Sequence, residues 1–407
     1  MKKFTRFSLF ILLLVAFSCI LAISFSAADD VVHLNVYNWG EYISDGSEGS
    51  LNVNKAFEEY YKKEFGVTVK VNYTTYEDNE SLYAKLKNGA TGYDVIFPSD
   101  YMIAKLIEGN MLAELNFDNI PNYEYIESKF RNLKYDPDNK YSIPYTYGVV
   151  GIIYNTKMVD KADVTGWDVL WNEKYSGNIL QFNNYRDAFG TAMYKLGIDV
   201  NTADRELWYK AYEELEKQNP IVQSYVMDQI FNKLESGKAA LGAYYAGDYF
   251  TMYEVNEDLA FYQPSYTNVF VDAMCVPKTS NNKTIAERYI NFMLSKEAAV
   301  ANAEYIYYAS PNSLVYNDPE YREYMGEEAL SILYPEGFDF AETYQKCGYS
   351  NLSDETILYA TNLWNQIKIS SGLPVGIVVT AGVIVLALSV IGIIYLVRSY
   401  KRKQLYK

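Results

Sequence analysis

Two hydrophobic patterns take turns along the chain, one with a period of two and one with apolar residues three or four positions apart. The first pattern is typical of β-strands and the second of amphipathic helices. Gly66 directly follows one helical pattern, in the position of a helix-terminating glycine. The elements predicted in this first part are strand 34–37, helix 53–65, strand 67–71, helix 80–87, strand 93–97 and helix 101–108.

The same alternation of strands and helices continues beyond residue 140. Alternation of this kind predicts a parallel or mixed sheet covered by helices, which is an α/β fold. Because 407 residues can form two domains, we expect two α/β lobes with the chain crossing between them. The elements predicted here are strand 145–154, helices 169–173, 188–196 and 205–217, strands 239–244 and 269–276, and helix 285–294.

Both ends of the chain differ from the body between them. Residues 1–28 begin with three basic residues, continue as an apolar run that ends in small residues, and contain no acidic residue. This order predicts a secretory signal peptide. Residues 373–397 are apolar, uncharged and longer than the roughly 20 residues that span a bilayer, and the basic tail 398–407 follows them. This order predicts a C-terminal transmembrane anchor that holds the body on the extracytoplasmic face of the cell membrane, with the tail in the cytoplasm.

Charge and cysteine content further limit the class of protein that this chain can be. The net charge is −15, and the leader and tail contribute three and five positive charges, so the body carries −23. An acidic body attracts cations and repels nucleic acid, although acidity also serves solubility. Three cysteines give no disulfide framework: Cys19 lies in the leader, and we expect Cys275 and Cys347 to be free thiols. Lipidation at Cys19 is the weaker alternative for the leader, because Ala16-Phe17-Ser18 is a poor lipobox.

Several signatures of catalysis and cofactor binding are absent. The sequence has no Gly-Lys-Ser/Thr phosphate loop and no Gly-x-Gly-x-x-Gly after a strand. His33 is the single histidine, which counts against His-based triads and zinc sites. We therefore expect no enzyme activity, no cofactor and no metal site. A glycosidase remains a weak alternative, since acidic residues are plentiful but no spacing singles out a pair.

Carboxylates stand beside aromatic residues at several predicted strand ends, where ligands bind in open α/β sheets. A buried ammonium group needs a paired charge or hydrogen bonds, and each aromatic face adds about 0.5–2 kcal/mol of attraction. The pattern therefore predicts a cleft for an organic cation with methylene links. Asp100 is predicted to be the N-cap of the following helix. The stretches are Trp39-Gly-Glu41-Tyr42, Ser99-Asp100-Tyr101, Tyr185-Arg186-Asp187, Tyr244-Tyr245-Ala-Gly-Asp248-Tyr249 and Phe270-Val-Asp272.

The body resembles the spermidine/putrescine-binding proteins of bacterial ABC importers. The resemblance extends over about 32–315 in the order of that family. It implies a two-lobed, type II periplasmic-binding-protein fold that closes over its ligand by a hinge, with 31–147 and 269–316 in lobe 1 and 148–268 and 317–370 in lobe 2. The stretches that carry it are Tyr37-Asn-Trp-Gly-Glu-Tyr42, 75–87, Tyr93-Asp-Val-Ile-Phe-Pro-Ser99, Tyr141-Ser-Ile-Pro-Tyr145 and Ser310-Pro-Asn312.

The resemblance also implies a set of polyamine-binding residues. The aromatic box around the methylenes would be Trp39, Tyr42, Tyr101, Tyr245, Phe270 and Tyr308. The amines would pair with Glu41, Asp187 and Asp272, and Ser99 would add a hydroxyl. Asp248 matches the putrescine-specific branch, whereas Asn184 stands where the spermidine-preferring branch has a carboxylate. The choice between the two polyamines therefore stays open.

By this resemblance the protein is the solute-binding component of a polyamine importer, and its partners would be a permease and an ATPase in the membrane. A ferric-ion-binding protein of similar architecture is the rival hypothesis. Adjacent tyrosines, Tyr244-Tyr245 and Tyr307-Tyr308, could supply phenolate ligands to iron. The lack of a partner histidine and the presence of Trp39-Gly-Glu41-Tyr42 count against that rival.

Overall fold

The computed structural model of the chain describes residues 31–370. The predicted signal peptide (1–28), transmembrane anchor (373–397) and basic tail (398–407) lie outside the described residues. Within residues 31–370, no helix is both long enough and apolar enough to cross a membrane.

The described chain forms two compact units, which we call unit 1 and unit 2, and passes repeatedly from one to the other. Unit 1 contains residues 31–150 together with Tyr244–Glu257 and Asn268–Asn351. Unit 2 contains Gly151–Ala243, Asp258–Thr267 and residues 352–370.

The sheet of unit 1 has the strand order β2-β1-β3-β9-β4. β1 pairs in parallel with β2 and β3, whereas β9 is antiparallel to β3 and β4. Every residue of β9 is buried, as expected for a central strand. The strands are β1 (Val32–Trp39), β2 (Val69–Tyr76), β3 (Val95–Ile96), β9 (Val269–Cys275) and β4 (Ser142–Asn155), which ends in unit 2.

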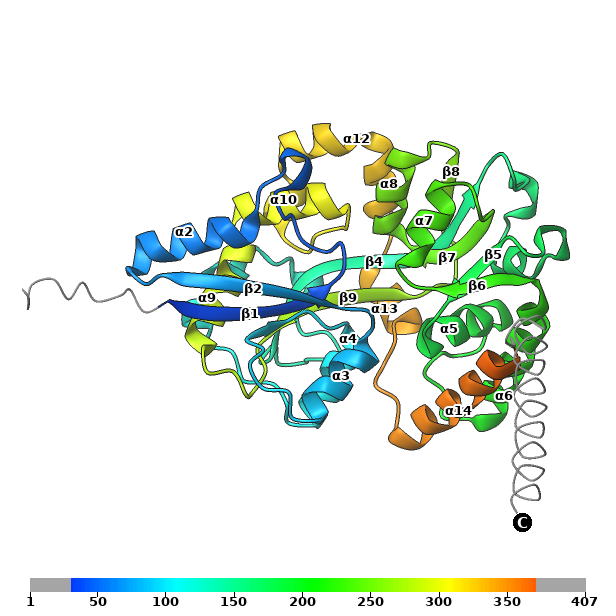
Figure 1. Ribbon diagram of the computed structural model, residues 1–407, viewed down its shortest axis with the longest axis horizontal. Coiled ribbons are helices and arrows are strands. Elements are labelled where there is room, and N and C mark those ends of the chain that lie inside the picture. The colour runs from blue at the N-terminus through cyan, green and yellow to red at the C-terminus, as the bar shows by residue number, and fades with distance from the viewer. Residues whose placement is uncertain (1–30, 371–407) are drawn as a thin grey trace, which may run out of the picture. The chain divides into compact units, whose positions relative to one another are not determined.

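Helices of unit 1 lie on both sides of the β1–β2 pair, with α2 and α10 on one side and α3 and α4 on the other (Figure 1). α2 shows how the sequence sets its bounds. The Asn52 side chain accepts from the backbone N–H of Lys55 at the start, and Gly66 ends the helix with φ 69°. The helices are α2 (Val53–Phe65), α3 (Asn79–Lys87), α4 (Asp100–Glu108), α8 (Ala246–Val255), α9 (Lys283–Met293), α10 (Lys296–Ile306), α11 (Ser313–Tyr316), α12 (Pro319–Leu333) and α13 (Phe340–Cys347).

In unit 2, β5 pairs in parallel with β6 and β7, and the end of β4 pairs with β8. Helix α14 packs against α6 and α5. The strands are β5 (Ile179–Phe182), β6 (Val222–Val226), β7 (Leu241–Tyr245, ending in unit 1) and β8 (Leu259–Tyr262). The helices are α5 (Tyr185–Leu196), α6 (Arg205–Gln218), α7 (Gln229–Glu235) and α14 (Asp354–Ser370).

Most predicted elements of the body are confirmed to within a few residues, and two local predictions are wrong. The predicted helix 169–173 consists of two short 3₁₀ segments, Trp167–Trp171 and Glu173–Tyr175. Asp100 is not the N-cap of α4 but its first residue, because Ser99 takes the cap position. Its side chain is fully buried and accepts the backbone N–H of Tyr101 instead.

The structure also divides the chain differently from the predicted lobes. Residues 244–257 and 317–351 were expected in lobe 2, yet both group with unit 1. Packing explains the difference, since α8 contacts α10 and α12, and α13 contacts β9. These contacts join segments that are distant in sequence, so no local sequence pattern predicts them.

Candidate functional site

Tyr42 and Asp272 come from distant parts of the chain and are hydrogen-bonded to each other in unit 1. The Tyr42 hydroxyl donates to Oδ2 of Asp272 over 2.7 Å. Thr146 lies opposite Asp272 in the β4–β9 register, next to an irregularity in the strand pairing, and its hydroxyl bonds to that of Tyr42. Burial, and after it the charge of Asp272, raises the pKa of Tyr42 well above its usual value. Tyr42 therefore keeps its proton and holds the Asp272 carboxylate in one orientation.

Tyr308 and Asp248 form a second pair of the same kind in unit 1. The Tyr308 hydroxyl donates to Oδ2 of Asp248 over 3.0 Å. Asp248 stands in the first turn of α8, where the helix dipole favours a negative charge. Burial, followed by the charge of Asp248, raises the pKa of Tyr308 well above its usual value. Each of the two carboxylates is thus held by a protonated tyrosine.

The rings of four predicted site residues form a continuous chain of contacts. Tyr42 meets Tyr308 edge to face, with ring centroids 4.9 Å apart. Phe270 follows at 6.3 Å from Tyr308, and Tyr245 lies 5.4 Å from Phe270. These are ordinary distances for aromatic pairs, so the rings support one another in place.

Two glycines leave room for these rings. A Cβ atom at Gly148 would lie 2.8 Å from the Phe270 ring, and one at Gly247 would lie 2.3 Å from the Tyr308 ring. Real Cβ atoms do not approach a ring so closely. Gly247 therefore belongs to the site through the space that it leaves for Tyr308.

Gly247→Ala is expected to lower the free energy of unfolding by about 1–3 kcal/mol, the usual cost of overpacking a filled core. Urea denaturation measures the difference. Gly166→Ala is the matched control, because a Cβ there meets nothing within 4 Å and the backbone is extended. Equal unfolding midpoints for the two variants would contradict the packing of Tyr308 on Gly247.

Trp39 is the last residue of β1, and Ser99 and Tyr101 lie at the start of α4, which follows β3. All three are partly exposed. The Trp39 indole N–H donates to the carbonyl of Phe97 over 2.7 Å. Ser99 forms an isolated backbone bridge with Asp272. The Tyr101 hydroxyl donates to Glu80 over 3.1 Å.

Glu41 is the exposed member of the predicted set in unit 1. Its backbone adopts φ 47°, a left-handed conformation that is uncommon for residues other than glycine. This turn directs the chain from β1 into the buried Tyr42. Tyr307 directly precedes the buried Tyr308 and also adopts a left-handed conformation, with φ 57°. Each of the two site tyrosines thus follows a residue in a strained conformation, which is typical of functional sites.

The two predicted residues of unit 2 form a pair of their own. Asn184 is the N-cap of α5, and its side-chain oxygen accepts from the backbone N–H of Asp187 over 2.8 Å. Its amide group donates in turn to Oδ2 of Asp187, also over 2.8 Å. Asn184 therefore has a structural role in capping α5 and orienting Asp187, in addition to any contact with a ligand.

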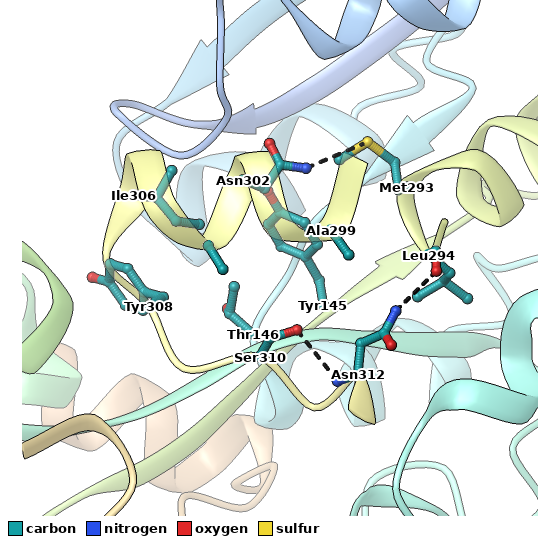
Figure 2. Close-up of a pocket in the computed structure, with 11 residues that line it drawn as sticks. Tyr145, Thr146, Met293, Leu294, Ala299, Asn302, Ile306, Tyr308, Ser310 and Asn312 are labelled. Carbon is teal, nitrogen blue, oxygen red and sulfur yellow. Dashed lines mark hydrogen bonds between the residues drawn. The ribbon is translucent and has the colours of Figure 1, made fainter. Parts of the chain in front are cut away.

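A small cavity within unit 1 is lined by Thr146 and Tyr308, among other residues (Figure 2). Its volume of about 10 Å³ is room for about one water molecule, far below the size of a pocket for an organic ligand. Asn302 faces it from α10, with the amide nitrogen 3.8 Å from Sδ of Met293 (Figure 2). The cavity adjoins the site but is too small to accept a solute.

Sequence reasoning missed several residues that touch the predicted set. Thr146 bonds to Tyr42, Asn79 and Glu80 bond to Tyr101, and the Tyr349 ring lies 5.9 Å from that of Tyr101. Asn79 and Glu80 belong to the stretch 75–87 that carries the family resemblance, so the signal for them was present. Thr146 and Tyr349 carry no such local signal.

Comparison with known proteins agrees with this fold. The sequence profile of bacterial extracellular solute-binding proteins matches residues 55–326. The spermidine/putrescine-binding periplasmic protein of Escherichia coli K12 is 34% identical over 314 residues, which are 77% of this chain and 85% of that protein. The spermidine/putrescine-binding periplasmic protein 1 of Haemophilus influenzae is 34% identical over 277 residues, 67% of this chain and 73% of that protein.

A solved structure gives the same result. The substrate-binding protein PotD of a spermidine/putrescine ABC transporter from Streptococcus pneumoniae is 32% identical and has a TM-score of 0.66. The match covers 84% of this chain and all of that structure's chain.

The fold is therefore that of the two-lobed, mixed α/β periplasmic binding proteins. The chain belongs to the family of bacterial extracellular solute-binding proteins, which take part in transport rather than catalysis.

The rival hypothesis of a ferric-ion-binding protein receives no support from these relatives. Burial also raises the pKa of Tyr307 and of Tyr308, which disfavours the phenolate form that binds iron. In the described part of the chain, residues 31–370, no group of three or more His, Cys, Asp or Glu side chains is arranged to hold a metal ion.

Proposed function

We propose that this protein is the extracytoplasmic polyamine-binding component of an ABC importer. One observation carries the proposal, namely a chain of contacting aromatic rings in unit 1 beside two carboxylates that tyrosine hydroxyls hold. The rings are those of Tyr42, Tyr308, Phe270 and Tyr245, and the carboxylates are those of Asp272 and Asp248. The Escherichia coli relative, a spermidine/putrescine-binding protein, supports the same ligand class.

The chemistry of this set suits a polyamine. Ammonium groups are donors without an acceptor, so carboxylates whose orientation is fixed are good partners for them. Aromatic faces cover the methylene segments and attract the adjacent charge by about 0.5–2 kcal/mol each. The charge of −23 on the body favours the approach of a cation.

The other predicted ligands take roles that follow from their chemistry. Trp39 and Tyr101 supply further aromatic surface, and Ser99 supplies a hydroxyl. Glu41 and Asp187 supply carboxylates, and Asn184 supplies an amide. A permease and an ATPase in the membrane would receive the polyamine from this protein.

Titration calorimetry of the full chain with putrescine, spermidine and spermine tests the proposal. We expect saturable binding of at least one of them. 1,4-Butanediol, which has the methylene segment of putrescine but no charge, is the matched control ligand and should not bind. If all three polyamines fail to bind, or if the diol binds as well as putrescine, the proposed function is wrong.

We further propose that residues 1–28 are a secretory signal peptide and that 373–397 anchor the protein to the membrane. The length and uncharged character of the second segment and the basic tail after it support the anchor. Deleting residues 373–407 is expected to move the protein from the membrane fraction to the soluble fraction without a change in polyamine affinity. Cell fractionation and calorimetry measure the two effects. If the protein that lacks residues 373–407 stays in the membrane fraction, this segment is not the anchor.

A further inference from the structure

Asn79 is the first residue of α3, and its side chain, only 5% exposed, connects two predicted ligands of unit 1. The amide nitrogen donates to the Ser99 hydroxyl over 3.1 Å and to the Tyr101 hydroxyl over 3.2 Å. The amide oxygen accepts the backbone N–H of Ser99 over 3.1 Å. One buried side chain therefore contacts both hydroxyl groups and the backbone at the start of α4.

The direction of these hydrogen bonds follows from the groups involved. The backbone N–H of Ser99 can only donate, so the Asn79 oxygen must face it and the NH₂ group must face the two hydroxyls. Both hydroxyl oxygens are then acceptors from Asn79, and their own hydrogens point elsewhere. The hydrogen of Tyr101 points to Oε1 of Glu80, 3.1 Å away.

This direction matters for a cationic ligand. An ammonium group only donates, so a hydroxyl helps to bind it by offering a lone pair and not a hydrogen. The oxygen of Ser99 has two lone pairs, of which Asn79 uses one. Asn79 thereby favours the orientation in which Ser99 acts as an acceptor.

The same side chain supports the position of Asp272. Ser99 forms an isolated antiparallel bridge with Asp272, and the backbone N–H of Ala273 donates to the carbonyl of Pro98 over 3.1 Å. Because Asn79 holds the backbone N–H of Ser99, it also holds the segment that lies beside Asp272.

We infer that Asn79 is a positioning residue of the polyamine site, which orients the hydroxyls of Ser99 and Tyr101 so that they accept hydrogen bonds from the ligand. This inference rests on the proposed function. Its alternative is that Asn79 only docks α3 against the start of α4. The alternative predicts a loss of stability alone, whereas our inference predicts a loss of affinity that depends on the two hydroxyls.

A double-mutant cycle separates the two possibilities. Asn79→Ala is made in the wild-type chain and in a Ser99→Ala/Tyr101→Phe chain, and affinity for putrescine and spermidine is measured by calorimetry on the full chain. We expect Asn79→Ala to weaken binding about tenfold in the wild type and less than about threefold where the hydroxyls are absent. The thermal midpoint should fall in both backgrounds, because the Ser99 N–H loses its acceptor in each, and it should fall further in the wild type, which also loses the two hydrogen bonds to the hydroxyls.

Asn155→Ala is the matched control. Asn155 is also 5% exposed, and its side chain accepts the backbone N–H of Lys157 in unit 2. This variant should lose stability and keep wild-type affinity. If Asn79→Ala does not fold, Asn79→Ser replaces it, because the shorter serine side chain cannot reach both the Ser99 and the Tyr101 hydroxyl. The same changes in affinity are expected for this variant.

Equal weakening in both backgrounds, or no weakening in the wild type, would overturn the inference while leaving the proposed function intact. A wild-type chain that binds neither polyamine would overturn the proposed function and the inference with it.

Discussion

Asp272→Asn is expected to weaken polyamine binding by between about 30-fold and a few thousandfold. Removing one partner of a buried, hydrogen-bonded charge pair typically costs about 2–5 kcal/mol. Asn has the shape of Asp and keeps an oxygen for the Tyr42 hydroxyl, whose bond to Asp272 measures 2.7 Å. The variant therefore removes the charge with little change in geometry. Titration calorimetry measures the loss.

Asp136→Asn is the matched control for this experiment. Asp136 is also a buried aspartate of unit 1, but its oxygens accept from the backbone N–H groups of Lys140 and Tyr141 and from the Ser142 hydroxyl. We expect it to lose stability and to keep its affinity. If both variants bind like the wild type, Asp272 is not a ligand. If both lose affinity equally, the effect comes from the fold and not from the site.

Asp100→Asn is expected to become more stable relative to the wild type as the pH rises from about 4 to 8. Burial, above all other causes, raises the pKa of Asp100 from 3.8 to about 7. The Tyr101 N–H and the charge of Lys134 oppose this rise, and the charge of Asp272 adds to it. The folded protein thus holds this proton to a higher pH than the unfolded chain does.

The sign of the effect follows from that difference. The stabilisation that Asp100 provides is fully present below its ordinary pKa near 4 and is lost as the pH rises through about 7. A shift of about three pKa units corresponds to about 4 kcal/mol. Asn resembles the neutral acid at every pH, so only the wild type loses this stability.

Urea denaturation of both proteins at pH 4, 6 and 8 measures the difference in free energy of unfolding. Asp138→Asn is the control, because its carboxylate is 72% exposed and its replacement should leave the pH dependence almost unchanged. A difference between Asp100→Asn and the wild type that stays constant from pH 4 to 8 would show that Asp100 does not carry its proton into the neutral range.

The sequence by itself determined the local elements of the body and the chemical character of the site. The period of the apolar residues predicted α2, α4 and α6 within one residue at each end, because the buried face of an amphipathic helix recurs in the sequence. Acidic and aromatic residues at predicted strand ends indicated a cation site, because parallel strands bring their carboxyl ends to one edge of a sheet.

Only the tertiary structure decided which of these residues meet. Tyr42 and Asp272 are 230 positions apart, and Tyr308 and Asp248 are 60 positions apart. The period of a strand or helix describes which face is buried but not what covers it. The grouping of α8 and α12 with unit 1 and the space that Gly247 leaves for Tyr308 also arise from packing between distant segments.

At Asp100, local sequence and tertiary structure favour different roles for one residue. Its place before an apolar helical pattern favours an N-cap, since Asp is a common residue at that position. In the fold, Ser99 takes the cap position and forms a bridge with Asp272, so the helix begins one residue earlier than predicted, at Asp100, whose side chain is buried. Ser and Asp are about equally good N-cap residues, so local preference does not decide between Ser99 and Asp100. The long-range bridge between Ser99 and Asp272 accompanies the choice of Ser99, and no local pattern contains it.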